Sequence, residues 1–377
     1  MLDETGPSIY NDDQARAAIQ ELLSYPSLLQ GMKAFLPAAL NDLILNAKDK
    51  INSVRDFQEK IAYPLFKGIE KASISTLSSS GLEQLAPTLQ YLFISNHRDI
   101  ILDSAFLNIV LFDQGFRTSQ IAIGDNLMRH RISELIFHIN KSFVVKRSGS
   151  PMELYRYSVQ LSEYIYKQIT GKTDSVWIAQ REGRAKDGDD RTQAGLVKML
   201  SLNTKSDLKT YFRELKVVPV AISYEYDPCD LLKTQEFLNK RADPDYKKTF
   251  EEDVQHMLLG LKGQKGAVHF HFSAPLDTEL DAFDAIPSPK KQLESLTEMI
   301  DQRIHQHYKL RPINYIAQDL LTKTDTFRNY YSNEDLEKGA AYFNQRFKLL
   351  TNDKEGFGQE YLLKMYANPL INFLTAT

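Results

Sequence analysis

The sequence predicts an α/β fold: a mixed, largely parallel β-sheet flanked by helices, with helical regions at both ends of the chain. Between about residues 72 and 275, short apolar runs alternate with segments of helical periodicity. Before this stretch, and again after Pro287, apolar residues repeat at helical spacing alone. We therefore expect a helical N-terminal region over residues 1–71, an α/β domain over 72–286 and a helical C-terminal region over 287–377.

The N-terminal region is expected to be helical from residue 11 to about residue 70. Its apolar residues at helical spacing are Ala15, Ile19, Leu22 and Leu23, followed by Met32, Phe35, Leu36, Leu40, Leu43 and Ile44. Pro26, Pro37 and Pro64 interrupt the pattern, which favours a small set of helices such as a bundle.

Seven strands are expected in the α/β domain, each a short run rich in apolar residues. They are Ser73–Leu77, Tyr91–Ser95, Gln120–Ile123, Ser142–Lys146, Val176–Ala179, Lys216–Ser223 and Ala267–Phe272. Helices are expected between them, over residues 100–113, 126–139, 151–170, 192–202 and 244–262. This alternation of strands and helices predicts the α/β class.

The C-terminal region begins at the boundary formed by Pro287-Ser288-Pro289. Helices are expected near residues 290–308, 314–323, 333–350 and 358–374. Tyrosine and phenylalanine are frequent here, which predicts aromatic core packing. The alternative is a surface for lipid or for a partner that carries an acyl group.

Composition and charge argue against several classes of protein. The net charge of −3 gives no support for nucleic-acid binding. The one cysteine, Cys229, allows no intrachain disulfide and no cysteine-rich zinc site. No signal peptide is evident, and no apolar run approaches the roughly 20 residues of a membrane-spanning helix. We expect a cytoplasmic protein that would reach a membrane only from its surface.

The segment from Asn96 to Asp103 is the most informative part of the chain. It follows an apolar strand and opens a helix, and open α/β sheets place their chemistry at the carboxyl ends of strands. His97, with a carboxylate at Asp99 or Asp103, could deprotonate a hydroxyl group near neutral pH. The structural alternative is a helix N-cap, Asp99, preceded by a surface histidine.

A second informative segment, residues 180–188, follows the strand 176–179. It holds three cations, Arg181, Arg184 and Lys186, around Gly183 and Gly188. Glycine lets the backbone come close to a ligand, and arginine suits bidentate contact with a phosphate. The alternative is a solvated loop whose charges are balanced by the neighbouring aspartates.

Two more strand ends complete the pattern. Lys146 and Arg147 end the strand that begins at Ser142, and Pro219 lies inside the run Val217–Ser223. A proline in a strand predicts an edge strand or the first turn of a strand.

Other catalytic patterns are weak or absent. No Gly-x-Ser-x-Gly segment occurs, which argues against an ordinary α/β-hydrolase. His130, Glu134 and His138 lie four apart on one helix face, and His269 and His271 lie two apart on one strand face. Neither set has an evident further ligand, so we expect no metal site.

Taken in order, the four strand ends resemble the sequence blocks of the glycerolipid acyltransferases. These enzymes acylate glycerol-3-phosphate or its 1-acyl product, lysophosphatidic acid. The blocks are similar to Asn96-His97 through Asp103, to Phe143–Arg147, to Glu182-Gly183-Arg184 and to Val218-Pro219-Val220. The resemblance covers about residues 72–275 and implies a glycerolipid-acyltransferase-like mixed sheet.

Two spacings differ from the family's pattern. Five residues separate His97 from Asp103, where the family has four, and the family's residue between Gly183 and Arg184 is missing. Either the loops absorb these shifts or Asp99 takes over the carboxylate role. Asp103 is favoured, because it would lie in the first turn of a helix capped by Asp99.

The resemblance implies direct acyl transfer without an acyl-enzyme. His97 would be the general base, and Asp103, or Asp99 in its place, would orient the imidazole. The residues implied to bind or shape the site of the phosphorylated acceptor are Asn96, Lys146, Arg147, Glu182, Gly183 and Arg184. No metal or resident cofactor is implied, since the donor is an acyl-CoA or acyl carrier protein thioester.

An acidic carrier protein would need a basic docking patch. Its candidate residues are Lys141, Lys146, Arg147, Lys233, Lys240, Arg241, Lys247 and Lys248, although surface charges are usually just solvated. Peripheral binding at the inner face of a membrane is expected. The alternatives are transfer to another lyso-lipid, such as lyso-ornithine lipid, and a non-catalytic lipid- or phosphate-binding module on the same fold.

Overall fold

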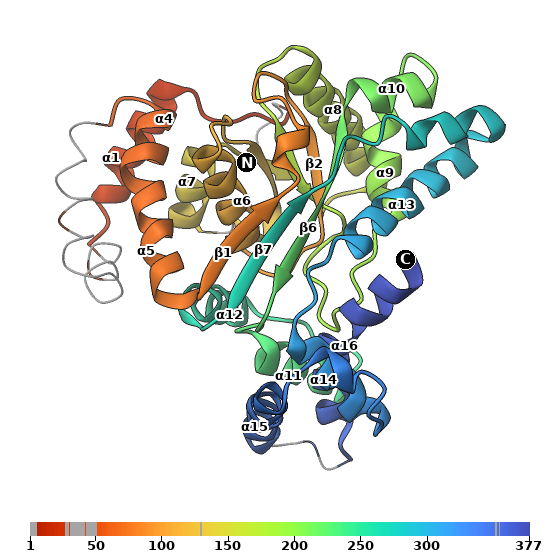
Figure 1. Cartoon of the computed structure of the whole chain (residues 1–377). Helices are drawn as coiled ribbons and strands as arrows, with labels where there is room; N and C mark the ends of the chain where they lie inside the picture. Colours follow the sequence, from red (N-terminus) through yellow and green to blue (C-terminus); the bar gives the residue numbers. More distant parts are fainter. Residues whose placement is uncertain are drawn as a thin grey trace.

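The computed structural model describes residues 6–26, 30, 42, 51–128, 130–350, 353 and 355–377. At its centre is a seven-stranded sheet in the order β1-β7-β6-β2-β5-β3-β4 (Figure 1). The strands are β1 (Thr76–Ser80), β2 (Leu92–Ser95), β3 (Gln120–Gly124), β4 (Ser142–Val145), β5 (Val176–Ala179), β6 (Val217–Tyr224) and β7 (Ala267–Phe272). All neighbours pair in parallel except β6 and β7. The predicted α/β class with a mixed sheet is confirmed.

Each of the seven predicted strands has a counterpart in the sheet. The largest shift is at β1, which was expected at Ser73–Leu77 and runs from Thr76 to Ser80. Of the two alternatives for Pro219, the edge strand was wrong, because β6 lies between β7 and β2; Pro219 is the third residue of β6. The carbonyl of Pro219 accepts from the backbone N–H of Ser273, the residue after β7. The nitrogen and the carbonyl of one residue face the same side of a strand, so the nitrogen of Pro219 also faces Ser273. Because Ser273 lies beyond the end of β7, the missing N–H of Pro219 removes no hydrogen bond between the two strands.

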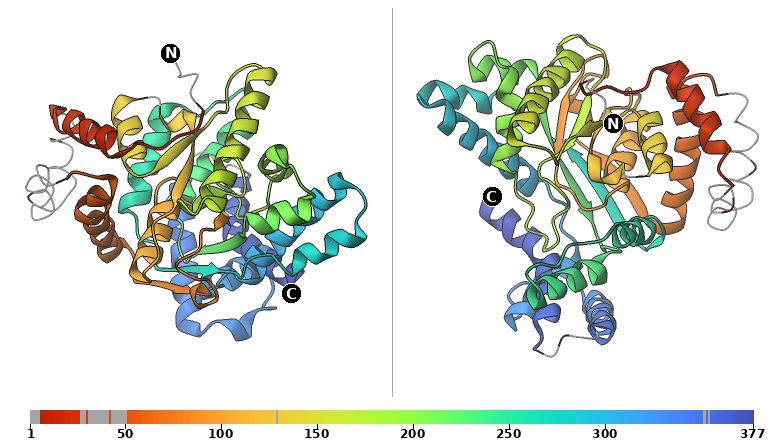
Figure 2. Two further views of the ribbon diagram at one scale, coloured as in Figure 1. Left: turned by 90° about the horizontal axis from the view of Figure 1, so that it is seen from above. Right: turned by 180° about the vertical axis from the view of Figure 1, so that it is seen from behind.

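Helices lie on both sides of the sheet (Figure 2). Before and within the sheet region they are α1 (Asp12–Leu23), α4 (Val54–Phe57), α5 (Tyr63–Ser73), α6 (Leu102–Asp113), α7 (Arg131–Ile139), α8 (Pro151–Thr170), α9 (Ala194–Leu200), α10 (Leu208–Glu214), α11 (Asp230–Ala242) and α12 (Phe250–Lys262). They are followed by α13 (Pro289–Gln306), α14 (Pro312–Thr322), α15 (Asn333–Leu349) and α16 (Phe357–Ala376). A π-helical turn, Gln58–Ala62, joins α4 to α5. The second apolar set expected near the N-terminus, from Met32 to Ile44, lies outside the described residues.

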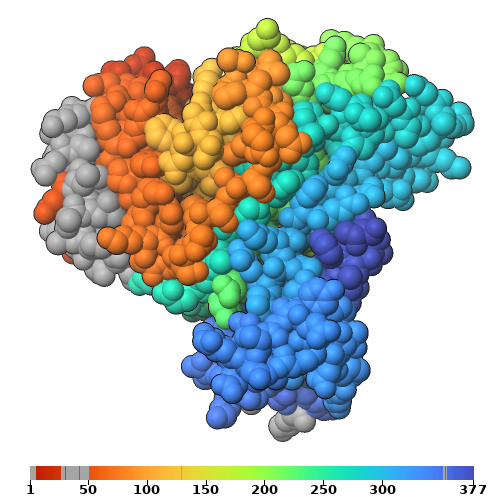
Figure 3. Space-filling model, in the orientation of Figure 1, coloured from red at the N-terminus to blue at the C-terminus, as the bar shows by residue number. Residues whose placement is uncertain are grey.

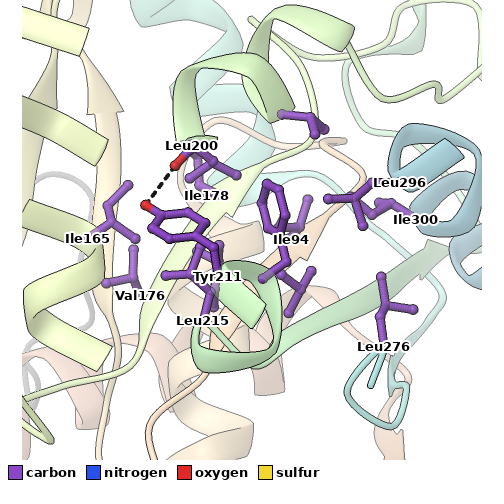
Figure 4. Close-up of a cluster of buried hydrophobic side chains, with 14 of the residues drawn as sticks. Ile94, Ile165, Val176, Ile178, Leu200, Tyr211, Leu215, Leu276, Leu296 and Ile300 are labelled. Atoms are coloured by element: carbon purple, nitrogen blue, oxygen red, sulfur yellow. Dashed lines mark hydrogen bonds between the residues drawn. The ribbon is translucent and has the colours of Figure 1, made fainter. Parts of the chain in front are cut away.

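The central strands β2 and β6 bury both of their faces, as alternate residues of β2 show. Leu92 and Ile94 of β2 point into one hydrophobic core, with side chains of α8, α9, α10 and α13 (Figure 4). Tyr91 and Phe93 point into the other core, against α6 and α5. A strand buried on both sides reads as a continuous apolar run, which is why β2 and β6 stand out in the sequence.

Helices α14, α15 and α16 have a core of their own and form the blue lobe at the bottom of Figure 3. Phe343 and Tyr366 are buried there, as expected for aromatic core packing. The lobe is tied to α11 through Asp230, whose Oδ2 accepts from the hydroxyls of Tyr342 at 2.5 Å and Tyr366 at 3.1 Å. The division into three units stays a prediction; α13, placed with the C-terminal unit, packs into the first core.

Candidate active site

His97 and Asp103 meet just beyond the carboxyl end of β2. Nδ1 of His97 lies 2.8 Å from Oδ2 of Asp103. The same oxygen accepts the backbone N–H groups of Arg98 at 2.6 Å and Asp99 at 2.9 Å. Three donors therefore converge on one buried carboxylate oxygen, and the imidazole is held with Nε2 free.

Asp99 has a different role. Its Oδ1 accepts the N–H groups of Ile101 at 2.9 Å and Leu102 at 2.8 Å, which lie at the start of α6. It therefore caps the helix that carries Asp103 and makes no hydrogen bond to His97. Burial raises the pKa of Asp99, and the neighbouring charge of Asp103 raises it further. The five residues between His97 and Asp103 thus form a loop closed by these hydrogen bonds.

Aromatic side chains surround the pair. The ring of Trp177 meets the imidazole of His97 edge to face, with centroids 5.9 Å apart. Tyr224, at the end of β6, is fully buried; burial and then the charge of Asp103 raise its pKa well above the ordinary value. Its phenol stays neutral at physiological pH.

Asn96 lies behind the site and links two strands. Its side chain is fully buried, accepts from the backbone N–H of Ile222 at 2.7 Å and donates to the carbonyl of the same residue at 2.9 Å. This pair of bonds joins the end of β2 to β6. Asn96 is not among the residues that line the cavity described below.

A buried ion pair stabilises the loop that carries His97. Lys233, on α11, is fully buried, and its ammonium lies 2.5 Å from Oδ2 of Asp227 and 3.0 Å from the carbonyl of Arg98. Burial alone would raise the pKa of Asp227, but the charges of Lys233 and Arg98 lower it below the ordinary value. Lys233 thereby fixes the peptide group between Arg98 and Asp99.

His97 lines a cavity of about 790 Å³. The cavity runs along β3, from Thr118 and Lys141 at the amino ends of β3 and β4 to Gly124 at the carboxyl end of β3. At about 3.3 Å per residue, this path measures roughly 20 Å. Its apolar lining is formed by Val54, Ala62, Phe66, Ile100, Ile101, Ala105, Ile109, Phe112, Phe116, Ile121, Ala122, Ile123, Leu127, Ile136, Phe137, Trp177, Ala179 and Met257.

Two arginines line the cavity at the end where His97 lies, which we call the carboxyl end. Arg147 follows β4, and its Nε lies 3.6 Å from Oε1 of the exposed Glu182. Arg181 follows β5 by two residues, and its Nε is buried without a hydrogen-bond partner. A buried, unpaired guanidinium nitrogen is costly unless an anion satisfies it. Arg181 was noted in the sequence but not among the expected binding residues; its place directly after an apolar strand was the available signal.

The other expected binding residues lie away from the cavity. The ammonium of Lys146 sits 4.7 Å from the ring centroid of Tyr157 on α8, because adjacent residues at a strand end point to opposite faces. Arg184 is buried, with Nη2 3.2 Å from Nδ1 of His256. Burial, and then the charge of Arg184, lowers the pKa of His256 to about 3. Gly183 has a φ of +70° and no atom near its Cβ position, so it forms an open turn.

The proposed basic docking patch is only partly at the surface. Lys233 is fully buried, and Lys141 is largely buried and paired with Asp174 at 3.1 Å. Both are therefore removed from any docking surface. Lys240 and Lys248 also have carboxylate partners, Glu236 and Asp253.

The C-terminal helix α16 holds the loop that follows Arg184. Pro369, inside α16, has no N–H to offer the carbonyl of Met365 four residues earlier. Gly188 packs there, since a Cβ on Gly188 would lie 2.2 Å from that carbonyl oxygen. Nδ2 of Asn368 donates to the carbonyl of Asp187 at 2.8 Å. The loop that follows Arg184 therefore packs into a notch on α16, formed at the carbonyl of Met365 and the ring of Pro369.

We expect Gly188→Ala to destabilise the protein by about 2–3 kcal/mol, because it combines backbone strain at φ +77° with overpacking against α16. Gly356→Ala is the matched control: φ is +76° and no atom lies within 4 Å of the Cβ position. It should cost only the strain, about 1 kcal/mol. Urea unfolding measures both values, and equal costs would show that the notch is not tightly packed.

Comparisons with known proteins give limited matches. No protein-family model matches the chain, and no curated protein matches it in sequence. Among solved structures, the chain is similar to the crystal structure of a 1-acyl-sn-glycerophosphate (LPA) acyltransferase from Thermotoga maritima. The two share 11% sequence identity with a TM-score of 0.34, over 79% of this chain and 98% of the other.

Two features are absent from the described residues. No group of three or more His, Cys, Asp or Glu side chains is placed to hold a metal ion. No helix in the same residues combines the length and the apolar character needed to cross a bilayer.

Proposed function

We propose that this protein transfers a fatty acyl group from an acyl thioester to a hydroxyl group of a phosphorylated glycerol acceptor, 1-acyl-sn-glycerol-3-phosphate or sn-glycerol-3-phosphate. One observation carries the proposal: a histidine held by a buried carboxylate lines a long apolar cavity at the same end as Arg147 and Arg181. The base, the site for an apolar chain and the site for an anion therefore lie together.

The proposed reaction is a direct displacement at the thioester carbonyl. Nε2 of His97 takes the proton of the acceptor hydroxyl as its oxygen attacks the carbonyl carbon. Asp103 stabilises the imidazolium through its bond to Nδ1. The tetrahedral intermediate then collapses, the carbon–sulfur bond breaks, and the leaving thiolate takes the proton from the imidazolium. Neither a metal nor a resident cofactor enters these steps.

The cavity suggests how the substrates would lie. An acyl chain fits the apolar stretch along β3, and the phosphate of the acceptor fits Arg147 and Arg181 at the carboxyl end. Which thioester is used, acyl-CoA or acyl carrier protein, stays a prediction, and so does peripheral binding to the membrane. Thiol release from acyl-CoA with each phosphorylated glycerol tests the proposal. No release with any acceptor or thioester donor would contradict it and favour a non-catalytic lipid- or phosphate-binding module.

We expect Arg147→Gln and Arg181→Gln each to raise the KM for the phosphorylated acceptor by about 10- to 100-fold, with a smaller effect on kcat. The reason is the loss of a charge-assisted hydrogen bond to the phosphate. Initial-rate kinetics over a range of acceptor concentrations measure this change.

Arg117→Gln is the matched control, because Arg117 lines the same cavity at the opposite end. Its acceptor KM should stay at the wild-type value. A phosphate-free acceptor such as lyso-ornithine lipid provides the second comparison. The phosphate-binding assignment is wrong if two results occur together. The wild type would use lyso-ornithine lipid efficiently, and the Arg147 and Arg181 variants would leave the KM of this acceptor and of the phosphorylated acceptors unchanged.

A further inference from the structure

The first turns of α8 present an exposed apolar pair beside cations. Met152 and Tyr155 are 60% and 57% exposed, among the most exposed large apolar side chains of the described residues. With Arg156 they lie at i, i+3 and i+4, and so share one face of the helix. The opposite face packs Tyr157, Leu161 and other apolar residues into the first core. We call Met152, Tyr155 and Arg156 the α8 patch.

The patch is held rigidly. Ser150 caps α8, with Oε2 of Glu153 accepting from the backbone N–H and the hydroxyl of Ser150 at 2.8 and 2.7 Å. Pro151 begins the helix. The apolar pair is therefore displayed on a fixed helix start.

Two cations lie beside the apolar pair. Arg156 is part of the patch, and the ammonium of Lys146 lies 4.7 Å from the ring centroid of Tyr157 on the same helix. Among the described residues, no carboxylate lies within ion-pair distance of Lys146 or Arg156. Two carboxylates near the start of α8 are already engaged: Glu153 accepts from the backbone N–H of Ser150 in the helix cap, and Asp125 accepts from the backbone N–H of Arg147 at 3.1 Å. An apolar pair with cations beside it suits an anionic lipid surface.

The patch follows the active site closely along the chain. Only four residues separate Arg147, at the carboxyl end of the cavity, from Met152. The side chain of Arg147 is 31% exposed, so this end of the cavity reaches the surface. A protein docked through the α8 patch would place the apolar cavity near the lipid that carries the acceptor.

We propose that the α8 patch docks the protein on a bilayer that contains anionic phospholipid. Met152 and Tyr155 enter the headgroup region, and Arg156 and Lys146 contact phosphate groups. A tyrosine suits this depth, since its ring is apolar and its hydroxyl reaches water. The inference rests on the proposed function only in supplying a membrane-borne acceptor.

The test is co-sedimentation of the full chain with vesicles of equimolar phosphatidylcholine and phosphatidylglycerol. We expect the double variant Met152→Gln/Tyr155→Gln to bind about tenfold or more weakly than the wild type, because two apolar side chains no longer enter the lipid. Wild-type binding should also weaken with added salt and on phosphatidylcholine alone.

The matched control is Ile371→Gln/Leu374→Gln. These residues are 40% and 50% exposed, have the same i, i+3 spacing and lie on α16, which contributes no residue to the cavity. Equal vesicle binding by wild type and the α8 double variant overturns the proposal, as does a larger loss in the α16 control. The proposal is also overturned if the wild type does not bind vesicles but does bind an acyl carrier protein, and the α8 double variant loses that binding.

A second readout separates docking from catalysis. With water-soluble glycerol-3-phosphate and acyl-CoA, the α8 double variant should keep the wild-type rate; with vesicle-borne lysophosphatidic acid its rate should fall. If no acceptor is acylated, the vesicle measurements still decide the docking proposal. An equal fall in rate with both acceptors overturns it, because the patch would then act on the reaction itself.

Discussion

Replacing His97 with glutamine should lower the kcat of acyl transfer by about 10²- to 10⁴-fold, the usual contribution of a positioned general base. Glutamine keeps a polar side chain of similar reach but cannot take the proton of the acceptor hydroxyl. The KM values of both substrates should change little, since the apolar lining and the arginines remain. Thiol release from acyl-CoA at saturating acceptor measures the effect.

His307→Gln is the control for this replacement. His307 stacks on His271 at 3.9 Å, at the C-terminal end of α13, and lines no part of the cavity. Its variant should keep the wild-type kcat. A correctly folded His97→Gln protein that also transfers acyl groups at the wild-type rate would remove histidine from the mechanism.

Replacing Lys233 with methionine should destabilise the protein by about 3–5 kcal/mol. Methionine fills similar volume but leaves the carboxylate of Asp227 buried without its main partner. It also releases the carbonyl of Arg98, the residue after His97. We therefore expect a lower kcat as well, even under conditions in which the variant is folded. Urea unfolding and initial rates at low temperature measure the two effects.

The destabilisation should depend on pH in one direction. In the wild type the pKa of Asp227 lies below its ordinary value of 3.8, so the pair contributes fully above that value. This contribution is lost as the pH falls through the lowered pKa. In the variant the charge of Lys233 no longer lowers the pKa of Asp227, so we expect burial to raise it. The protonated carboxyl is uncharged and does not need a cationic partner. The difference between wild type and variant should thus be largest near pH 7 and shrink toward pH 4.

Lys338→Met serves as the surface control. Lys338 pairs with Glu334, and both side chains are largely exposed. Such pairs contribute at most about 1 kcal/mol, so this variant should unfold almost as the wild type does. If Lys233→Met is no more harmful, or if its cost grows toward low pH, the buried pair does not support the loop.

The strands were predictable because burial on both sides leaves a direct trace in the sequence. The run Tyr91–Ser95 has no surface face, so all its residues but the last are apolar. Helices α10 and α11 were missed. In α11 the buried side chains include the polar residues Lys233, Thr234 and Glu236, so its inner face does not stand out as apolar in the sequence. Their burial depends on partners such as Asp227 and Lys186 that no local pattern reveals.

The site was predictable to the level of the loop but not of every side chain. The bond between His97 and Asp103 follows from a local turn, so spacing along the chain pointed to it. The position of Arg184 depends on how the loop after β5 turns at Gly183. A loop one residue longer or shorter would point the side chain after the turn in another direction, and this cannot be read from the sequence. The structure therefore brings Arg181 to the cavity, and the basic pair at 146–147 is divided between two faces of the sheet.

The packing of Gly188 near Pro369 also sets the order in which two parts of the structure form during synthesis. Gly188 lies in the middle of the chain, and the helix that receives it spans Phe357–Ala376. Until α16 has been synthesised, the sheet can assemble, but the loop at Gly188 lacks the helix against which it packs. Contacts between distant segments of the chain form late and slowly. A nascent chain would thus form its His97–Asp103 pair before α16 fixes the loop at Gly188.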